Sequence, residues 1–325
     1  MVRKFSIPHS SAIPVDEYLN LVSNYKDSID NIFTGLPEIT NHMSYDINSQ
    51  LDEATIKLRG EREHEFLLKS KGLYKRLITI NQLHYPMSDS DLFKFIDNTL
   101  YQYIEKYEID GIILTHLPLA IKLRNDFPNI ELHTSCNCYQ WTIRQMEQWR
   151  NYAGINVFNP PREIGRMPKL LKEMHDAGFK LKVLVNEACA FGCAFSINHG
   201  SALSSRTNCN IDCCNGTLIN ALRSNLVLPS WLKELDEYVS IYKISGRWSS
   251  LKALEQTFDA YIQQKGGYYL HEFTAMSGYN PIARLADMGI FIPESLIPNK
   301  VKYCECKECD KSCFQCRDAL LKIIT

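Results

Sequence analysis

Cysteines are the residues of this sequence best suited to chemistry, and the twelve of them are unevenly distributed. None precedes Cys136, and ten fall in two groups, at 189–214 and 304–316. In a reducing compartment such clusters indicate metal or iron–sulfur ligation rather than disulfides. Three residues separate Cys189 from Cys193, a spacing that lets two thiolates bind one cluster or ion from a turn. We therefore expect a thiolate site in this first group.

The ligand set of the first group stays open. Cys189 and Cys193 are the firmest choices, and the others are expected among the cysteines that follow. Cys136 and Cys138 could supply a ligand, although ordinary roles in a loop fit them equally well. Four sulfur ligands suit structural zinc or an iron–sulfur cluster, and a position directly after an expected strand favours a functional cluster. The candidate ligands are Cys189, Cys193, Cys209, Cys213 and Cys214.

The second group lies near the end of the chain. Its cysteines are interleaved with Lys, Glu and Asp, which excludes a buried apolar role. Zinc and a second iron–sulfur cluster fit this spacing equally well. Its distance in sequence from the expected strands favours a structural or electron-relay role. Its members are Cys304, Cys306, Cys309, Cys313 and Cys316.

The overall composition excludes some function classes. The 36 Lys and Arg residues nearly balance the 37 Asp and Glu residues, so no global basic surface marks an obligate nucleic-acid binder. No apolar run is long enough for a signal peptide or a membrane span. We therefore expect a cytoplasmic protein.

The elements that must position these residues follow a βα rhythm, in which short apolar runs alternate with helical periodicity. This pattern predicts a (β/α)₈ TIM-like barrel over residues 1–266, including a Cys-rich loop at 186–228 with little helical or strand pattern. Residues 267–325 are expected to form a small Cys-rich appendage. The eight candidate strands are Phe5–Pro8, Ile29–Thr34, Arg76–Ile80, Gly111–Thr115, Glu131–Thr134, Ile155–Phe158, Leu181–Val185 and Ser240–Ile244.

Polar side chains follow these strands, and in such a barrel all strand ends meet at the face that carries the active site. Arg162 and Arg247 are suited to bind a carboxylate or phosphate. Glu163 could instead favour a helix N-terminus, and Glu187 could tune a cluster rather than transfer protons. Every position is also compatible with ordinary loop polarity. The catalytic candidates are Arg162, Glu163, Glu187, Arg247, His199 and His116, with His84 a further proton carrier.

Five ordered motifs between about residues 75 and 265 resemble the collagenase-like peptidase family U32. They are the strand Ile109–Leu114, the strand end Leu132–Asn137, the Arg-Glu pair in Pro161–Glu163, the cysteine loop Cys189–His199 and the segment Tyr242–Arg247. The resemblance implies a barrel and, in the oxygen-independent hydroxylase branch, a 4Fe–4S cluster held by four cysteines, with a prephenate-like oxygen donor. Two features depart from the family pattern: the cysteine spacing of the loop, and Ser245 in place of a glutamate.

Three functions remain open at this point. The leading hypothesis is an iron–sulfur enzyme that hydroxylates or otherwise modifies an RNA base, a quinone precursor or a peptide. The second is a peptidase or other hydrolase, although the chain has neither a G-x-S-x-G nor an H-E-x-x-H motif. The third is a non-catalytic cluster- or zinc-bearing subunit that works with a protein partner.

Overall fold

The computed structural model describes residues 2–35, 52–83, 88–204, 222–275 and 281–297, together with 318 and 321. Its centre is a curled seven-stranded sheet with the order β5-β4-β3-β2-β1-β7-β6, in which every neighbouring pair is parallel. The strands are β1 (Phe5–Pro8), β2 (Ile29–Thr34), β3 (Arg76–Ile80), β4 (Gly111–Leu114), β5 (Glu131–Thr134), β6 (Lys182–Leu184) and β7 (Ile241–Lys243).

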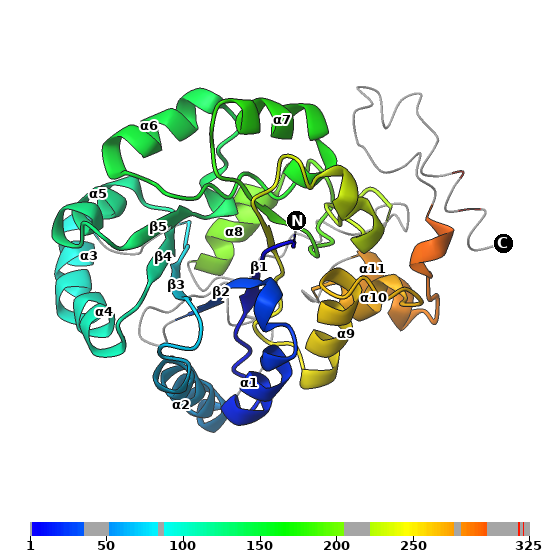
Figure 1. Ribbon diagram of the computed structural model, residues 1–325, viewed down its shortest axis with the longest axis horizontal. Helices are drawn as coiled ribbons and strands as arrows, with labels where there is room; N and C mark the ends of the chain where they lie inside the picture. Colours follow the sequence, from blue (N-terminus) through cyan, green and yellow to red (C-terminus); the bar gives the residue numbers. More distant parts are fainter. Residues whose placement is uncertain are drawn as a thin grey trace.

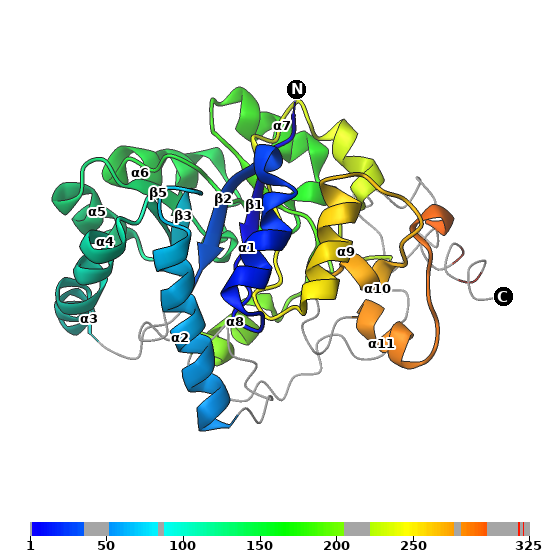
Figure 2. The same ribbon diagram turned by 60° about the horizontal axis from the view of Figure 1, so that its bottom comes forward.

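Helices surround this sheet, as Figure 1 shows, and the view in Figure 2 shows α1 and α2 lying along its outer side. This is the TIM-like α/β arrangement that the βα rhythm predicts. The helices are α1 (Val15–Ser23), α2 (Glu53–Lys69), α3 (Asp89–Phe95), α4 (Tyr101–Tyr107), α5 (Leu117–Asp126), α6 (Ile143–Ala153), α7 (Pro168–Asp176), α8 (Ser196–Ser204), α9 (Leu251–Tyr261), α10 (Leu270–Phe273) and α11 (Pro281–Asp287).

The strand expected at Ile155–Phe158 requires a correction, because this segment does not form a regular strand. Val157 makes a single parallel bridge to His133 of β5, and Phe158 makes one to Leu181 beside β6. The two prolines that follow lack the backbone N–H that would extend the ladder. The sheet thus has seven strands rather than eight in the described part of the chain, and its two edge strands both lie next to this segment.

Side chains of the sheet divide into an outer layer and an inner face. Most buried apolar residues belong to the outer layer under the helices, whereas Phe33, Leu77 and Ile113 form a separate small cluster. Alternation along β7 places Tyr242 in the outer layer, so Lys243 points to the inner face. The inner face therefore carries polar and charged groups beside a small apolar cluster.

Local signals in the sequence explain several helix boundaries. The Ser88 hydroxyl accepts a hydrogen bond from the Asp91 backbone N–H and caps α3. A capping box of Thr142 and Gln145 begins α6. Gly178 adopts a left-handed conformation with φ of 79° just after α7, where a side chain would be strained.

The Cys-rich loop contains a helix that its sequence did not predict. Helix α8 occupies Ser196–Ser204, an apolar-poor segment without clear helical periodicity. Antiparallel pairing of Ala190 with Ser224 holds the two ends of the loop together. The other expected thiolates of this loop lie outside the described residues, as do all five tail cysteines. These are Cys209, Cys213, Cys214, Cys304, Cys306, Cys309, Cys313 and Cys316.

Part of the expected C-terminal appendage contacts the sheet region. Leu270 and Phe273 of α10 are buried in the outer core layer, and the Ala275 backbone N–H donates to the Asn186 carbonyl at 2.7 Å. None of the described helices is long and apolar enough to cross a membrane.

Candidate functional site

Arg162 joins the exits of several strands through its side-chain contacts. One guanidinium nitrogen forms an ion pair with Glu187, and the other donates to the Asn137 Oδ1 at 2.9 Å. Asn137 in turn donates through Nδ2 to the Asn81 carbonyl at 3.1 Å. Residues after β3, β5, the 155–158 segment and β6 thus meet at the carboxyl end of the sheet. This is the face at which TIM-like folds carry their active sites.

The first thiolate group lies at this same end. Cys189 and Cys193 are half-buried and form no disulfide bond. The charges of Glu187, Cys136 and Cys189 raise the pKa of Arg162 against the opposing effect of burial. Cysteines from two different strand exits therefore lie near one guanidinium group. In the described part of the chain, no three His, Cys, Asp or Glu side chains form a metal site.

Cys136 and Cys138, which the sequence could not rank, occupy different environments. The Cys138 thiol donates to the Leu114 carbonyl at 3.3 Å, and burial raises its pKa. The Cys136 thiol instead donates to the Asn137 Oδ1 at 3.8 Å, the oxygen that also accepts from Arg162. Since metal ligation requires a thiolate, Cys138 is the poorer ligand of the two.

Glu163 is 3% exposed and lies just before the short 3-10 helix Ile164–Arg166, not at the start of α7. Burial raises the pKa of Glu163. Its Oε2 has no hydrogen-bond partner among the described residues. The carboxyl group is therefore suited to hold a proton, and support of a long helix N-terminus does not explain it.

Two cations extend from the end of β7. Arg247 donates to the Thr79 hydroxyl of β3 at 2.8 Å. Lys243 is 6% exposed, and its Nζ lies 4.5 Å from the centre of the Phe33 ring. Burial lowers the pKa of Lys243 to about 8. The charge of Arg247 lowers this pKa further, whereas the charge of Cys136 acts to raise it. Sequence reasoning included Lys243 in a motif but missed it as a site residue, since only the alternation along β7 places it inside.

The histidine candidates differ in their surroundings. The His116 Nδ1 accepts from the Leu119 backbone N–H at 3.2 Å and caps α5, while its Nε2 lies 3.3 Å from the Asp89 Oδ1. Both ring nitrogens thus have contacts at the start of a helix. His199 belongs to α8, but its side chain lies outside the described part, as does His84.

Several buried carboxamides at the strand exits have polar atoms without a hydrogen-bond partner among the described residues. Buried polar groups are normally paired, so a concentration of unpaired ones at one end indicates a place for water or ligand. They belong to Asn81, Gln140, Asn159 and Asn225.

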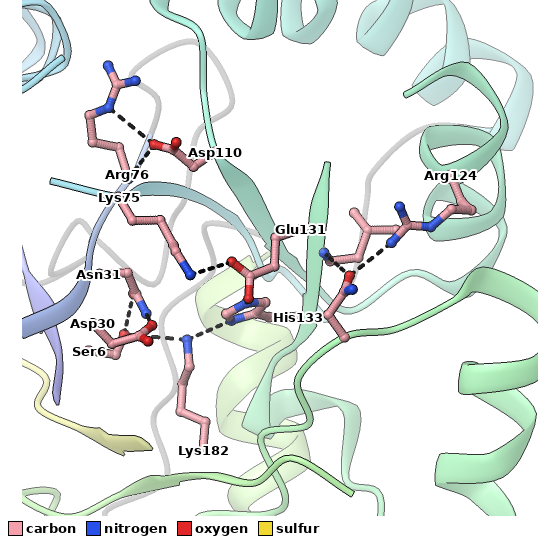
Figure 3. A network of polar contacts seen from close by, with 12 residues as sticks. Ser6, Asp30, Asn31, Lys75, Arg76, Asp110, Arg124, Glu131, His133 and Lys182 are labelled. Atoms are coloured by element: carbon pink, nitrogen blue, oxygen red, sulfur yellow. Dashed lines mark hydrogen bonds and ion pairs between the residues drawn. The ribbon is translucent and has the colours of Figure 1, made fainter. Parts of the chain in front are cut away.

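A second polar cluster lies near the amino ends of the strands, and Figure 3 shows it from close by. The fully buried Lys182 Nζ lies 2.7 Å from the His133 Nδ1 and 3.4 Å from the Ser6 Oγ. The His133 Nε2 lies 3.1 Å from a Glu131 oxygen, whose other oxygen pairs with Lys75 at 2.9 Å. We call these five residues the basal network. Its position at the amino ends is typical of residues that stabilise such a fold.

Comparisons with known proteins agree with the motifs. No protein-family model matches the chain. An uncharacterized protease of Methanocaldococcus jannaschii is 22% identical over 232 residues, which cover 67% of each chain. The solved structure of the U32 peptidase Mk0906 superposes with a TM-score of 0.54 at 12% identity, covering 76% of this chain and 94% of that one. This likeness shows a shared fold. Together with the five ordered motifs, these matches support a relationship between this chain and the collagenase-like U32 peptidase family.

Proposed function

We propose that this chain is an iron–sulfur enzyme that modifies its substrate at the carboxyl end of the sheet, by oxygen-independent hydroxylation or a related reaction. One observation carries the proposal: the buried Arg162 contacts Glu187 and Asn137, which lie within two residues of Cys189 and Cys136 at different strand exits. Thiols gathered beside a cation and unpaired polar groups suit a reactive centre better than a peripheral zinc staple.

The described thiols fit part of a cluster site. Cys189 and Cys193 would hold a 4Fe–4S cluster, with the remaining ligands from Cys209, Cys213 and Cys214 or from Cys136. When bound, the cluster supplies one-electron chemistry that amino-acid side chains lack. For the tail cysteines, zinc and a second cluster remain equally compatible with their spacing.

Two neighbouring side chains are suited to act on the substrate. Arg162 is fixed by Glu187 and Asn137, and its Nε is a buried donor without a partner among the described residues. It can therefore orient an oxygen of the substrate. Glu163 is the candidate to exchange a proton with the reacting group, because its Oε2 has no hydrogen-bond partner among the described residues and burial raises its pKa.

The substrates compatible with this proposal are an RNA base, a quinone precursor or a peptide, with a prephenate-like molecule as the oxygen donor. The names of the relatives suggest a peptidase as the competing function. The described contacts give no specific support to that alternative, since the one described histidine among the catalytic candidates caps α5.

Anaerobic purification tests the proposal. We expect a brown protein with broad visible absorption and about four irons and four sulfides per chain. The same preparation is incubated with casein and gelatin, on which we expect no cleavage. A colourless protein that binds only zinc, or one that cleaves these proteins at a rate independent of iron, would overturn the proposal.

A further inference from the structure

We propose that Lys243, together with Arg247, binds the carboxylate or phosphate group of a small anionic substrate. The inference rests on the proposed function in one respect, the assignment of this end of the sheet as the active site. It narrows the substrate class to a small molecule that carries an oxyanion. It also assigns anion binding to Lys243, which lies within the Tyr242–Arg247 motif but was not predicted to be a site residue.

Lys243 has no carboxylate within ion-pairing distance among the described residues, although the charges of Cys136 and Glu187 act on it from farther away. Its side chain is 6% exposed, and it forms no hydrogen bond or ion pair with any residue in the described ranges. The Phe33 ring, 4.5 Å away, attracts the ammonium group without neutralising it. Burying an unpaired ammonium is costly, so a protein that retains one has a reason outside its own packing.

The neighbours of Lys243 strengthen this reasoning. Arg162, which was expected to bind an anion, already has Glu187 as its partner. The Glu187 carboxylate is thus already engaged by another cation. Lys243 remains as the cation that an incoming anion would neutralise.

Arg247 supplies a second contact from the same strand exit. It is half-buried, and it donates to a neutral hydroxyl, that of Thr79. A guanidinium group is planar and always charged, and its N–H donors match the geometry of an oxyanion. One compact ammonium and one planar guanidinium can then contact the same small group.

A comparison inside the protein shows that an unpaired lysine is not a general property of this sheet. Lys182 is also buried on the inner face, but it contacts His133 and Ser6. The chain therefore provides partners where a lysine is structural. The absence of such partners around Lys243, among the described residues, marks it as a binding residue.

The test is a calorimetric titration of the anaerobically purified full chain at pH 7 with malonate, inorganic phosphate and malonamide. Malonamide has the shape of malonate without its charge. We expect malonate or phosphate to bind and malonamide not to bind. The anion that binds with the lower Kd shows whether the site prefers a carboxylate or a phosphate group.

Variants locate the binding. Lys243→Met should weaken anion binding at least about tenfold, since a hydrogen bond to a charged group contributes this much. It should keep or raise the melting temperature, because the methionine removes an unpaired charge but retains an apolar stem. Lys243→Arg should retain most of the binding. The exposed Lys233→Gln is the matched control and should change nothing.

The outcomes separate this inference from the proposed function. Equal binding by Lys243→Met and the natural protein, or equal binding of malonate and malonamide, would overturn the anion site. A failure of Lys243→Met to fold would identify Lys243 as structural, and a folded Lys243→Arg that binds no anion would also overturn the site. A colourless protein whose malonate binding depends on Lys243 would refute the cluster but retain this inference.

Discussion

Two buried lysines share the inner face of the curled sheet and differ in their partners. Lys182 contacts His133 and Ser6 near the amino ends of the strands. Lys243, near the carboxyl ends, has no hydrogen-bond or ion-pair partner among the described residues, and the pKa of each is lowered chiefly by burial. The difference teaches that burial and charge alone do not reveal the role of a side chain. A buried charged group with hydrogen-bond partners stabilises the fold, whereas one without them is suited to bind a ligand.

The largest expected effect comes from breaking the basal network. His133→Ala removes the acceptor of Lys182 and leaves a cavity in the fully buried interior. The free energy of unfolding should fall by about 3 kcal/mol, measured by urea denaturation. The double variant Lys182→Met with His133→Leu should recover much of this loss, because no buried polar group is then left unpaired. An unchanged midpoint for His133→Ala would show that the network is not structural.

A weaker effect on stability is expected at the carboxyl end. Glu187→Gln removes the charge that neutralises Arg162 but keeps an acceptor. The free energy of unfolding should fall by about 1 to 2 kcal/mol, while malonate should bind more tightly because the site becomes more positive. Calorimetric titration measures the malonate affinity, and urea denaturation of the same preparation measures the free energy of unfolding. A loss of malonate affinity would contradict the charge balance described for this end.

Acid should weaken the folded protein through its buried histidines. Burial lowers the pKa of both His9 and His133 to about 3. An unfolded histidine takes up a proton near pH 6.5, so between these values the unfolded chain binds more protons and stability falls as the pH falls. Each histidine should contribute about 1.4 kcal/mol per pH unit over this window. His133→Gln should reduce the slope by that amount, and an unaltered slope would exclude a neutral His133.

The smallest effect is expected at the solvent end of the basal network. Lys75 is about one-third exposed where it pairs with Glu131. Lys75→Gln should lower the free energy of unfolding, measured by urea denaturation, by less than about 1 kcal/mol, because water and salt screen such ion pairs. A loss of unfolding free energy as large as that of His133→Ala would mean that the exposed ion pair stabilises the fold as much as the buried contacts of the basal network.

Hydrophobic alternation made the strands predictable, and with them the end of the sheet at which polar residues gather. It failed at Ile155–Phe158, which is apolar enough for a strand but makes single bridges before two prolines. Helix α8 was missed because Ser196–Ser204 carries little apolar periodicity. Packing and the paired ends of the loop, rather than intrinsic pattern, determine such elements.

The candidate site was predictable only in outline. Arg162, Glu187 and Arg247 follow strands, so their common location could be inferred. The partners could not, because residues far apart in sequence form each contact; Lys182 and His133 lie 49 positions apart. Nor could the sequence separate Cys136 from Cys138, since only the fold determines that one thiol donates to the Asn137 side chain and the other to the Leu114 carbonyl.

One measurement tests the central claim, that the carboxyl end of the sheet is a thiolate-based reactive site, most directly. Iron content and visible absorption are determined for the anaerobically purified chain, for Cys189→Ser and for Cys138→Ser. We predict that Cys189→Ser loses most of the iron and colour, whereas Cys138→Ser keeps both because its thiol is committed to the Leu114 carbonyl. Full iron content and unchanged absorption in Cys189→Ser would contradict this claim.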